Sequence, residues 1–242
     1  MLELRGVSKS FGSLQALHGV DLSVADNTIA GLIGPNGSGK STLLHGIVGR
    51  IRVDSGSIAV DGNDITAMSV PQRVTAGLSI KFQLPRIYRE LSTRENLLLA
   101  SQRTESLRGL MLSRSRRRLQ DVVQQTLERF QLDGLGDRLA GVLSHGQQQW
   151  LEIAMAMSVN PRILLLDEPT GGMSSEERER TGEIIRELSA TCSVLIVEHD
   201  LDWIRRLCGQ ITVLDQGSLV RTGTPQEMEQ DEKVKEVYRA RS

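Results

Sequence analysis

A glycine-rich loop between an apolar strand and a helix constrains this chain more than any other feature. Residues 34–42 match the pattern G-x-x-x-x-G-K-[ST], with the apolar run Ala30–Ile33 before them and a helix-favouring segment, residues 42–48, after them. Glycines let backbone N–H groups curl around phosphate oxygens, and the helix N-terminus adds partial positive charge. A glycine-rich turn with a chance Lys-Ser pair is the alternative, but the flanking strand and helix favour a phosphate-binding loop.

The loop supplies a full set of candidate phosphate contacts. We expect Lys40 to reach the β- and γ-phosphates of a nucleoside triphosphate, and the hydroxyl of Ser41 to coordinate Mg²⁺. The candidate nucleotide-binding residues of the loop are Gly34, Pro35, Asn36, Gly37, Ser38, Gly39, Lys40, Ser41 and Thr42.

Two adjacent carboxylates end a second apolar run, Ile163–Leu166, far along the chain. Asp167 is placed to hold the Mg²⁺ shell, and Glu168 is placed to accept a proton from a water that attacks the γ-phosphate. For this pair alone, a solvated strand end is an equally good interpretation. The phosphate loop elsewhere in the chain favours the catalytic one.

The rest of the pattern is that of an α/β protein. Short apolar runs separated by helical segments predict a mostly parallel sheet that is buried on both faces. These runs are residues 28–33, 163–166, 193–197 and 211–214. Alternating residues predict antiparallel strands on one side, at residues 2–4, 19–24 and 57–60. Ser174 with Glu177, and Thr224 with Glu227, have the spacing of capping boxes at helix starts.

The middle third of the chain has a helical pattern and almost no strand pattern. We interpret about residues 92–157 as a helical subdomain inserted into a core of about residues 1–91 and 158–242. The 242 residues then form one domain.

Composition argues against several other classes of protein. The net charge of −1 and the 3% of aromatic residues disfavour nucleic-acid binding by a basic surface or by base stacking. No apolar stretch approaches the roughly 20 residues of a membrane-spanning helix, and the first residues lack a signal-peptide pattern. Cys192 and Cys208 lack metal-ligand spacing and are expected to be small buried residues in a reducing, cytosolic compartment.

Further motifs, together with the phosphate loop, resemble the ATP-binding cassette (ABC) family over nearly the whole chain. They are Leu143-Ser144-His145-Gly146-Gln147, which lies between the two motifs above, and Leu195–Asp200, which follows the second. The resemblance implies a P-loop NTPase (RecA-like) core with an antiparallel β subdomain and a helical insertion. It also implies hydrolysis of ATP, with Mg²⁺, coupled to transmembrane transport.

The resemblance assigns roles that no local pattern reveals. Gln83 would touch Mg²⁺ and water and sense the transporter, His199 would hold the γ-phosphate, and Phe11 would stack on adenine. The signature segment would contact the γ-phosphate held by a second ABC ATPase subunit, through Ser144, Gly146 and Gln147. The catalytic set is then Lys40, Gln83, Glu168 and His199, and the metal ligands are Ser41, Gln83 and Asp167.

Two segments depart from the family pattern. His145 stands in the signature where the family has glycine, so its side chain either crowds the phosphate or turns away and leaves its N–H at a helix N-terminus. We favour the second alternative. The segment Gly171–Ser174 lacks the acidic residue of the family's D-loop, which puts communication between subunits through that group in doubt.

These departures, together with the tail of the chain, indicate one branch of the family. Residues 171–177 resemble the G-M-[ST]-x-E-E segment of branched-chain amino acid importers, residues 143–153 resemble the urea-type ATPase of that group, and residues 223–238 contain a similar tail. The resemblance implies a subunit on the cytoplasmic face of the inner membrane that powers import of a branched-chain amino acid, urea or a similar small amide. Its partners would be a second ABC ATPase subunit, permease subunits and, indirectly, a solute-binding protein.

Two other functions and one charged segment stay open. An exporter ATPase of the lipopolysaccharide type has similar size and motifs, whereas a non-transport ABC ATPase would need coiled-coil arms or a second cassette. The segment Arg108–Arg118 is the most charged part of the chain. It is either a solvated helical face or a contact for acidic lipid headgroups or a membrane subunit.

Overall fold

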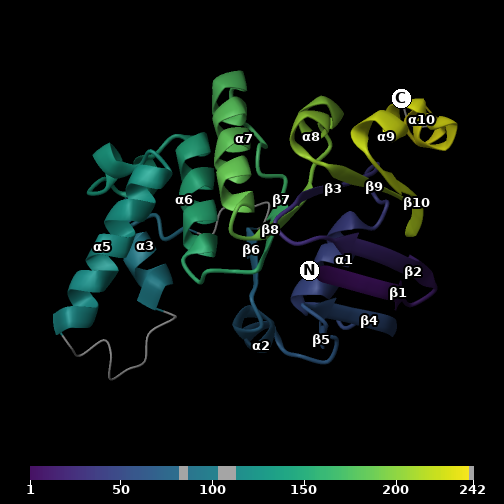
Figure 1. The fold of residues 1–242 in the computed structure, drawn as a ribbon, viewed down its shortest axis with the longest axis horizontal. Coiled ribbons are helices and arrows are strands. Elements are labelled where there is room, and N and C mark those ends of the chain that lie inside the picture. The colour runs from purple at the N-terminus through teal and green to yellow at the C-terminus, as the bar shows by residue number, and fades with distance from the viewer. Residues whose placement is uncertain (82–86, 103–112, 240–242) are drawn as a thin grey trace. The chain divides into compact units, whose positions relative to one another are not determined.

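The structure, a computed structural model, describes residues 1–81, 87–102 and 113–239. Its strands form a four-stranded sheet, in the order β2-β1-β4-β5, and a six-stranded sheet, in the order β10-β9-β3-β8-β7-β6 (Figure 1). The strands are β1 (Leu2–Phe11), β2 (Leu14–Val24), β3 (Ile29–Ile33), β4 (Ser55–Val60), β5 (Asn63–Asp64), β6 (Leu78–Lys81), β7 (Ile163–Asp167), β8 (Ser193–Val197), β9 (Gln210–Asp215) and β10 (Ser218–Gly223). The helices are α1 (Lys40–Val48), α2 (Val70–Thr75), α3 (Thr93–Gln102), α5 (Ser113–Arg129), α6 (His145–Met157), α7 (Ser175–Ser189), α8 (Leu201–Leu207), α9 (Pro225–Gln230) and α10 (Glu232–Arg239), with short 3₁₀ helices η1 (Asp133–Leu135) and η2 (Ala140–Val142).

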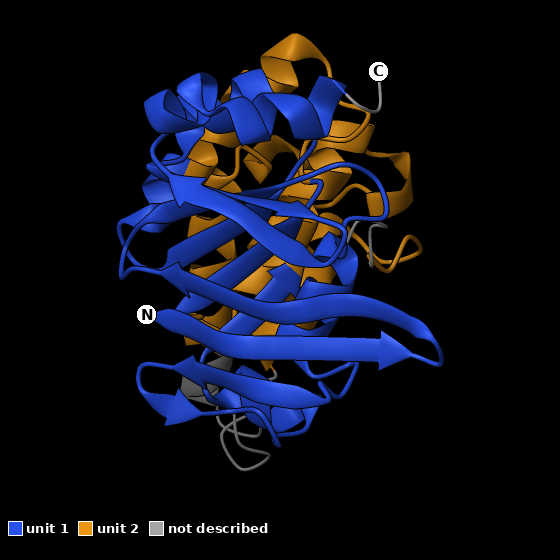
Figure 2. Cartoon of the chain, turned by 90° about the vertical axis from the view of Figure 1, so that its right-hand side faces the viewer, with its two compact units in different colours: residues 1–80, 162–168, 186–242 blue, residues 81–161, 169–185 orange. Residues whose placement is uncertain are grey.

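The chain forms two compact units, which Figure 2 shows in different colours. Unit 1 contains residues 1–80, 162–168 and 186–242, and unit 2 contains residues 81–161 and 169–185. Unit 1 therefore holds nearly all of both sheets, and unit 2 holds α3, α5, α6 and most of α7.

The six-stranded sheet contains the parallel strands that the apolar runs predict. β3 pairs in parallel with β8 and with β9, and β7 pairs in parallel with β8. Every residue of β3, β7 and β8 is buried, as expected for strands that are covered on both faces. β10 adds an antiparallel strand at the edge beside β9. The prediction of an α/β fold is confirmed.

The antiparallel sheet is larger than its alternating segments predict. β1 and β2 pair along nearly their whole length, with register shifts between the paired stretches. Gly6 and Gly19 lie in these irregular stretches with φ values of 59° and 62°, a conformation that residues with a Cβ rarely adopt. The shifts interrupt the alternation of apolar residues. They also explain why the sequence pattern did not predict that Phe11 ends a long strand.

A buried arginine joins α2 to the end of α1. Arg73 is 2% exposed, and its guanidinium donates to the carbonyl oxygens of Gly46 at 2.7 Å and of Ile47 at 2.6 Å. It also donates to the carbonyls of Thr66 and Met68. The last carbonyls of a helix lack partners within the helix and carry partial negative charge. The cation therefore caps α1, the helix that starts at the phosphate loop.

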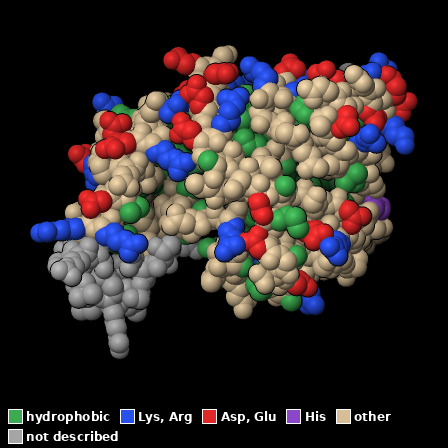
Figure 3. All heavy atoms as spheres, in the orientation of Figure 1, with side chains coloured by type: hydrophobic (Ala, Val, Ile, Leu, Met, Phe, Trp, Pro, Cys, Tyr) green, Lys and Arg blue, Asp and Glu red, His purple; other side chains and the backbone are tan. Residues whose placement is uncertain are grey.

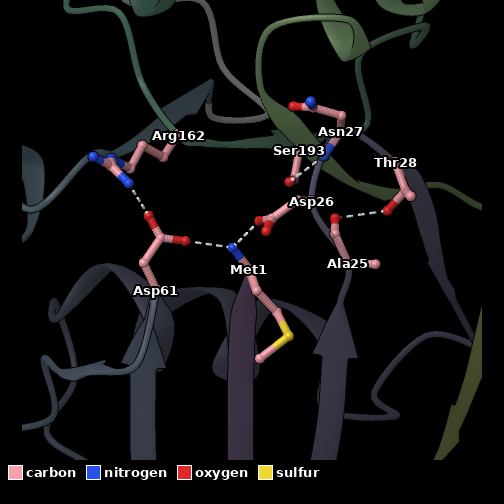
Figure 4. Close-up of polar contacts among 8 residues, drawn as sticks. All are labelled: Met1, Ala25, Asp26, Asn27, Thr28, Asp61, Arg162 and Ser193. Carbon is pink, nitrogen blue, oxygen red and sulfur yellow. Dashed lines mark hydrogen bonds and ion pairs between the residues drawn. The ribbon is translucent and has the colours of Figure 1, made fainter.

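Charged groups connect the β4–β5 turn to the start of β7 (Figure 4). The carboxylate of Asp61, in the turn, accepts hydrogen bonds from the amino group of Met1 and from the guanidinium of Arg162, while Asp26 also accepts from Met1. The amino group of Met1 and then Arg162 hold the pKa of Asp61 below its usual value. Arg162 lies directly before β7, so the contacts bring together two distant parts of unit 1.

Helix caps in both units follow the predicted spacings. The hydroxyl of Ser174 accepts the N–H of Glu177 at 3.2 Å at the start of α7, and Thr224 and Glu227 form the same reciprocal pair at α9. The capping-box predictions are confirmed. In unit 2, the described part of the middle third consists of α3, α5, α6 and the two 3₁₀ helices.

The described surface near the C-terminus is of mixed charge (Figure 3), and both thiols are buried. Acidic and basic side chains are interspersed over α9 and α10 (Figure 3). One pair there is Lys235 with Glu232, at 2.6 Å. Across the described ranges, every helix is too short or too polar to span a lipid bilayer. Cys192 and Cys208 are buried free thiols, as expected, and burial raises the pKa of Cys208 to about 12.

Candidate nucleotide site

The phosphate loop adopts the backbone conformation that its glycines permit. Gly37 and Gly39 have φ values of 79° and 106°, and a Cβ at Gly39 would lie 2.8 Å from the carbonyl oxygen of Ala16. Gly39 is also the N-cap of α1, so no side chain caps the first amides of the helix. The loop can therefore present backbone N–H groups and a helix N-terminus to an anion.

Lys40 is held by its own loop. Its Nζ donates to the carbonyl oxygens of Gly34 at 2.7 Å and of Pro35 at 2.9 Å. Burial lowers the pKa of Lys40 from its ordinary value, and the charges of Glu168 and Asp167 oppose this shift. Phosphate oxygens that replaced the two carbonyls would accept stronger, charge-assisted hydrogen bonds from the same ammonium group.

The two carboxylates lie where β7 ends. Asp167 is the last residue of the strand and is 8% exposed, whereas the side chain of Glu168 is 29% exposed. Glu168 has a φ of 46°, which is uncommon for a residue with a Cβ, and its N–H donates to the carbonyl of Val197 at 2.9 Å. Such backbone conformations cluster at functional sites, where the surrounding structure maintains them.

One cavity of about 570 Å³ collects most of the predicted residues of unit 1. It is lined by Phe11, by residues 36–42 of the phosphate loop and by both carboxylates. Phe11 is 47% exposed at the end of β1, with the Nζ of Lys9 5.4 Å from the centre of its ring. An exposed ring beside a cavity that is lined by the phosphate-binding loop is suited to stack on a nucleotide base.

Sequence reasoning missed another side of this cavity. Leu14, Gln15, Ala16 and His18 of β2, together with Val197 and the turn Gln216–Gly217, complete the lining. The N–H of His18 donates to the carbonyl of Gly217 at 2.8 Å, which holds the β9–β10 turn against β2. A Gln-Gly pair between two strand-like runs is compatible with a hairpin turn, but no local pattern indicates that such a turn contacts β2.

His199 lies beside the carboxylates, next to a buried acid that the sequence analysis did not select. Its Nδ1 is 3.9 Å from Oε1 of Glu168 and 3.6 Å from Oε2 of Glu198. Glu198 is 1% exposed, and its Oε2 also accepts the backbone N–H of His199 at 3.2 Å. Asp200 then caps α8 by accepting the N–H of Trp203 at 3.0 Å. The histidine thus sits between the catalytic candidate and a second carboxylate.

The signature residues belong to unit 2 and are not among the described residues that line the cavity. Ser144 is the N-cap of α6, and its hydroxyl accepts the N–H of Gln147 at 3.2 Å. In return, Oε1 of Gln147 accepts the N–H of Ser144 at 3.0 Å. Gly146 is buried in the first turn. The imidazole of His145 contacts the carbonyl of Gly171, so the ring turns toward another segment of unit 2.

Two predicted features lie partly or wholly outside the described residues, and the predicted magnesium ligands can be judged by their chemistry. Gln83 and most of Arg108–Arg118 lie outside the residues that the structure describes. The Ser41 hydroxyl and the Asp167 carboxylate line the same cavity and are hard oxygen donors, which is the ligand type that Mg²⁺ prefers. The residues present therefore fit a magnesium ion bound together with phosphate oxygens.

Comparison with known proteins agrees with this geometry. The family model described as ABC transporter matches residues 17–171. The chain is 34% identical to the high-affinity branched-chain amino acid transport ATP-binding protein BraF of Pseudomonas aeruginosa, over 98% of this chain and 97% of that protein. It is 33% identical to the lipopolysaccharide export system ATP-binding protein LptB of Haemophilus influenzae, over 98% of this chain and 96% of that protein.

Solved structures with the same fold include the ADP conformation of MJ1267, an ATP-binding cassette of an ABC transporter. That chain has a TM-score of 0.86, 31% sequence identity and 98% coverage of both chains. The dimeric post-hydrolysis state of the cassette MJ0796, bound to ADP and Pi, has a TM-score of 0.81 and 26% identity, over 93% of this chain and 99% of that chain. The chain is therefore a member of the ABC transporter family, and specifically one of its ATP-hydrolysing subunits.

Proposed function

We propose that this subunit powers an importer for a branched-chain amino acid, urea or a similar small amide. The observation that carries the proposal is the likeness to BraF, which extends over 98% of this chain. The segment Gly172–Glu177 and the tail after Gly223 support the same branch, because both resemble the segments of that group of importers. The transported solute would bind on other subunits.

In this function the cavity of unit 1 holds ATP. Phe11 stacks on the base, the amides of residues 36–42 surround the phosphates, and Lys40 exchanges its two carbonyl partners for β- and γ-phosphate oxygens. Ser41 and Asp167 hold the magnesium ion, with Gln83 as a further ligand. The ion offsets negative charge on the phosphates when it is bound.

Hydrolysis uses the two groups beside the γ-phosphate position. Glu168 accepts a proton from the attacking water, and its partial exposure leaves room for that water. His199 contacts the γ-phosphate and lies 3.9 Å from Glu168, so one imidazole orients both the phosphate and the carboxylate. The backbone of Glu168 has a φ of 46°, so the chain leaves the extended conformation of β7 at this residue.

Two copies, or this chain and a sister subunit, would complete each site. The dimeric MJ0796 cassette supports this arrangement. Ser144, Gly146 and Gln147 of one subunit would contact the γ-phosphate bound by Lys40 of the other, at the N-terminus of α6. ATP then stabilises the closed dimer, and hydrolysis releases it. Gln83 and the helical region of unit 2 would transmit the motion to permease subunits on the cytoplasmic face of the membrane.

Transport by the reconstituted complex tests the proposal. The full chain is combined in liposomes with permeases and a solute-binding protein of this importer branch that co-purify with it, and uptake of labelled leucine and urea is measured with ATP inside. We expect uptake of one of them, and its loss in the matched complex that carries Glu168→Gln. Rapid ATP hydrolysis with no uptake of either solute would overturn the assignment to this branch.

The second candidate is an exporter ATPase of the lipopolysaccharide type. The 33% identity to LptB, over 98% of this chain, favours it nearly as strongly. The two functions differ in their membrane partners. ATP hydrolysis that is stimulated by lipopolysaccharide and exporter permeases, and not by a solute-loaded binding protein, would support the exporter.

A further inference from the structure

The two segments that depart from the family pattern lie against each other in unit 2. Nε2 of His145 is 2.9 Å from the carbonyl oxygen of Gly171. A carbonyl only accepts hydrogen bonds, so Nε2 carries the proton and donates it. The amide nitrogen of Gln149, one turn along α6, lies 3.3 Å from the same nitrogen, and because both nitrogens then carry hydrogen this contact is not a hydrogen bond. The ring that replaces the family's glycine therefore bonds to the segment that replaces the family's acidic D-loop.

A glycine lies opposite the ring and gives it room. Gly172 has a φ of 72°, and a Cβ at this position would lie 3.1 Å from Cδ2 and 3.2 Å from Nε2 of His145. A contact that short would force the ring to move by a few tenths of an ångström. Gly172 therefore leaves space for the imidazole as well as permitting a left-handed turn.

A carboxylate makes a second connection between the same two segments. The hydroxyl of Ser144 donates to Oε1 of Glu177 at 3.1 Å, and the N–H of Ser174 donates to Oε2 at 3.0 Å. The Glu177 carboxylate also packs on Gly146, where a Cβ would lie 2.4 Å from Oε1. The start of α6 and the start of α7 are thus joined by both a ring and a carboxylate.

We propose that His145 is a positioning residue that holds the segment Gly171–Ser174 to the N-terminus of α6. This segment begins three residues after Glu168 in the chain. The proposal rests on the proposed function, in which Ser144 engages the nucleotide of the partner subunit and Glu168 acts on the nucleotide of its own. Because the segment follows Glu168 closely in the chain, holding it to α6 would make hydrolysis at one site depend on occupancy of the other, which is a coupling between sites.

Hydrogen–deuterium exchange of the full chain without nucleotide tests the connection itself. We compare His145→Gly, which restores the family residue, with His145→Gln, which keeps a side-chain N–H donor. Loss of one hydrogen bond of ordinary strength predicts about five-fold faster exchange of the amides at residues 171–174 in His145→Gly. His145→Gln should restore most of the protection. Equal exchange in the three proteins would overturn the proposal.

Kinetics of the assembled transporter test the coupling. In His145→Gly we expect kcat for ATP hydrolysis to fall about five-fold and the Hill coefficient for ATP to approach one. The Kd of the isolated subunit for a fluorescent ATP analogue should stay unchanged, because His145 does not line the nucleotide cavity. A lower Tm with unchanged kcat and Hill coefficient would mean that the residue only stabilises the fold, and would refute the positioning role.

A matched pair of glycine variants isolates the contact of the ring. Gly172→Ala and Gly62→Ala introduce a Cβ at similar φ values, 72° and 77°, but a Cβ at Gly62 has nothing within 4 Å. We expect only Gly172→Ala to speed exchange at residues 171–174, and we expect His145→Gly to reduce the added effect in the double variant. An additive double variant would contradict the proposal.

The exchange and kinetic experiments distinguish a failure of the proposed function from a failure of the positioning role of His145. If the assembled protein fails to hydrolyse ATP, the proposed function fails, while exchange in the nucleotide-free chain still decides whether His145 holds the segment. If hydrolysis proceeds and exchange is insensitive to His145, the proposed function stands and the positioning role is rejected.

Discussion

Oε2 of Glu198 accepts the backbone N–H of His199 at 3.2 Å and lies 3.6 Å from Nδ1 of the same residue. The side chain of Glu198 has 0% exposure, whereas that of His199 is 65% exposed. A buried carboxylate thus lies against an imidazole that otherwise faces solvent, and this contact favours one orientation of the ring. The same arrangement of an acid behind a catalytic histidine sets ring orientation in other enzymes.

Glu198→Gln should lower the rate of hydrolysis without lowering nucleotide affinity. The amide keeps the size of the side chain but removes the charge that accepts the backbone N–H of His199 and lies 3.6 Å from Nδ1. We expect kcat to fall by about five- to ten-fold, the factor for weakening one hydrogen bond to a charged group. Asp202→Asn, an exposed carboxylate on α8, is the matched control and should change kcat little. A kcat equal to wild type in Glu198→Gln would show that the carboxylate does not orient His199.

Glu168→Gln should bind ATP and hydrolyse it very slowly. Loss of the proton acceptor is expected to reduce kcat by at least about 100-fold, the lower limit usual for a general base. Binding should persist because the phosphate loop is unchanged, and the variant should accumulate as an ATP-bound dimer in size-exclusion chromatography with light scattering. Normal turnover would assign the role of base to another group.

Lys40→Ala should lose nucleotide affinity. The ammonium group would make two charge-assisted hydrogen bonds to phosphate, and their removal should raise the Kd for a fluorescent ATP analogue by about 10- to 100-fold. Lys9→Ala removes a cation near Phe11 instead, and we expect a smaller effect. Unchanged titration curves for Lys40→Ala would exclude this lysine from phosphate binding.

The local sequence pattern predicts those parts of the candidate site that directly follow a buried strand. The run before Gly34 and the run before Asp167 are apolar because β3 and β7 are covered on both faces, so their ends could be located from sequence. The parallel order of these strands then brings the two ends to the same edge of the sheet. The cavity lined by Lys40 and Glu168 follows from this order.

Contacts between distant segments could not be predicted in the same way. Nothing near Arg73 in the sequence indicates that it caps α1, and nothing near His145 indicates the carbonyl of Gly171. Such partners are set by how whole elements pack, whereas periodicity reports only which face of one element is buried. Glu198 was missed for a related reason, because a carboxylate directly after an apolar strand resembles an ordinary exposed strand end.

Arg73→Leu should destabilise unit 1 strongly. The variant removes the guanidinium donor from the carbonyls of Ile47, Thr66 and Met68, while the carbonyl of Gly46 keeps the N–H of Gly49 at 3.1 Å. Unsatisfied buried acceptors cost about 1–3 kcal/mol each. We expect the free energy of unfolding to fall by about 3 kcal/mol in urea denaturation. Arg52→Leu replaces an exposed arginine and should change the free energy of unfolding by less than about 0.5 kcal/mol. Equal midpoints for the two variants would show that water replaces the cap.

The contacts of Asp61 should make unit 1 lose stability in acid. The amino group of Met1 and the guanidinium of Arg162 hold its pKa below the ordinary value of 3.8, so the unfolded chain binds a proton more readily than the folded one. The contribution is fully present above pH 3.8 and is lost as the pH falls through the lower pKa of the folded chain. Partial solvent exposure keeps the effect modest.

Thermal unfolding from pH 5 down to pH 2 measures this contribution. The Tm of Asp61→Asn should lie below that of wild type at pH 5, and the two curves should converge toward pH 2, because protonation removes the same charge as the substitution. Asp202→Asn, whose carboxylate is exposed, should follow wild type across the range. Parallel curves for Asp61→Asn and wild type would mean that the carboxylate contributes through packing and not through its charge, since only a charge effect depends on the protonation state.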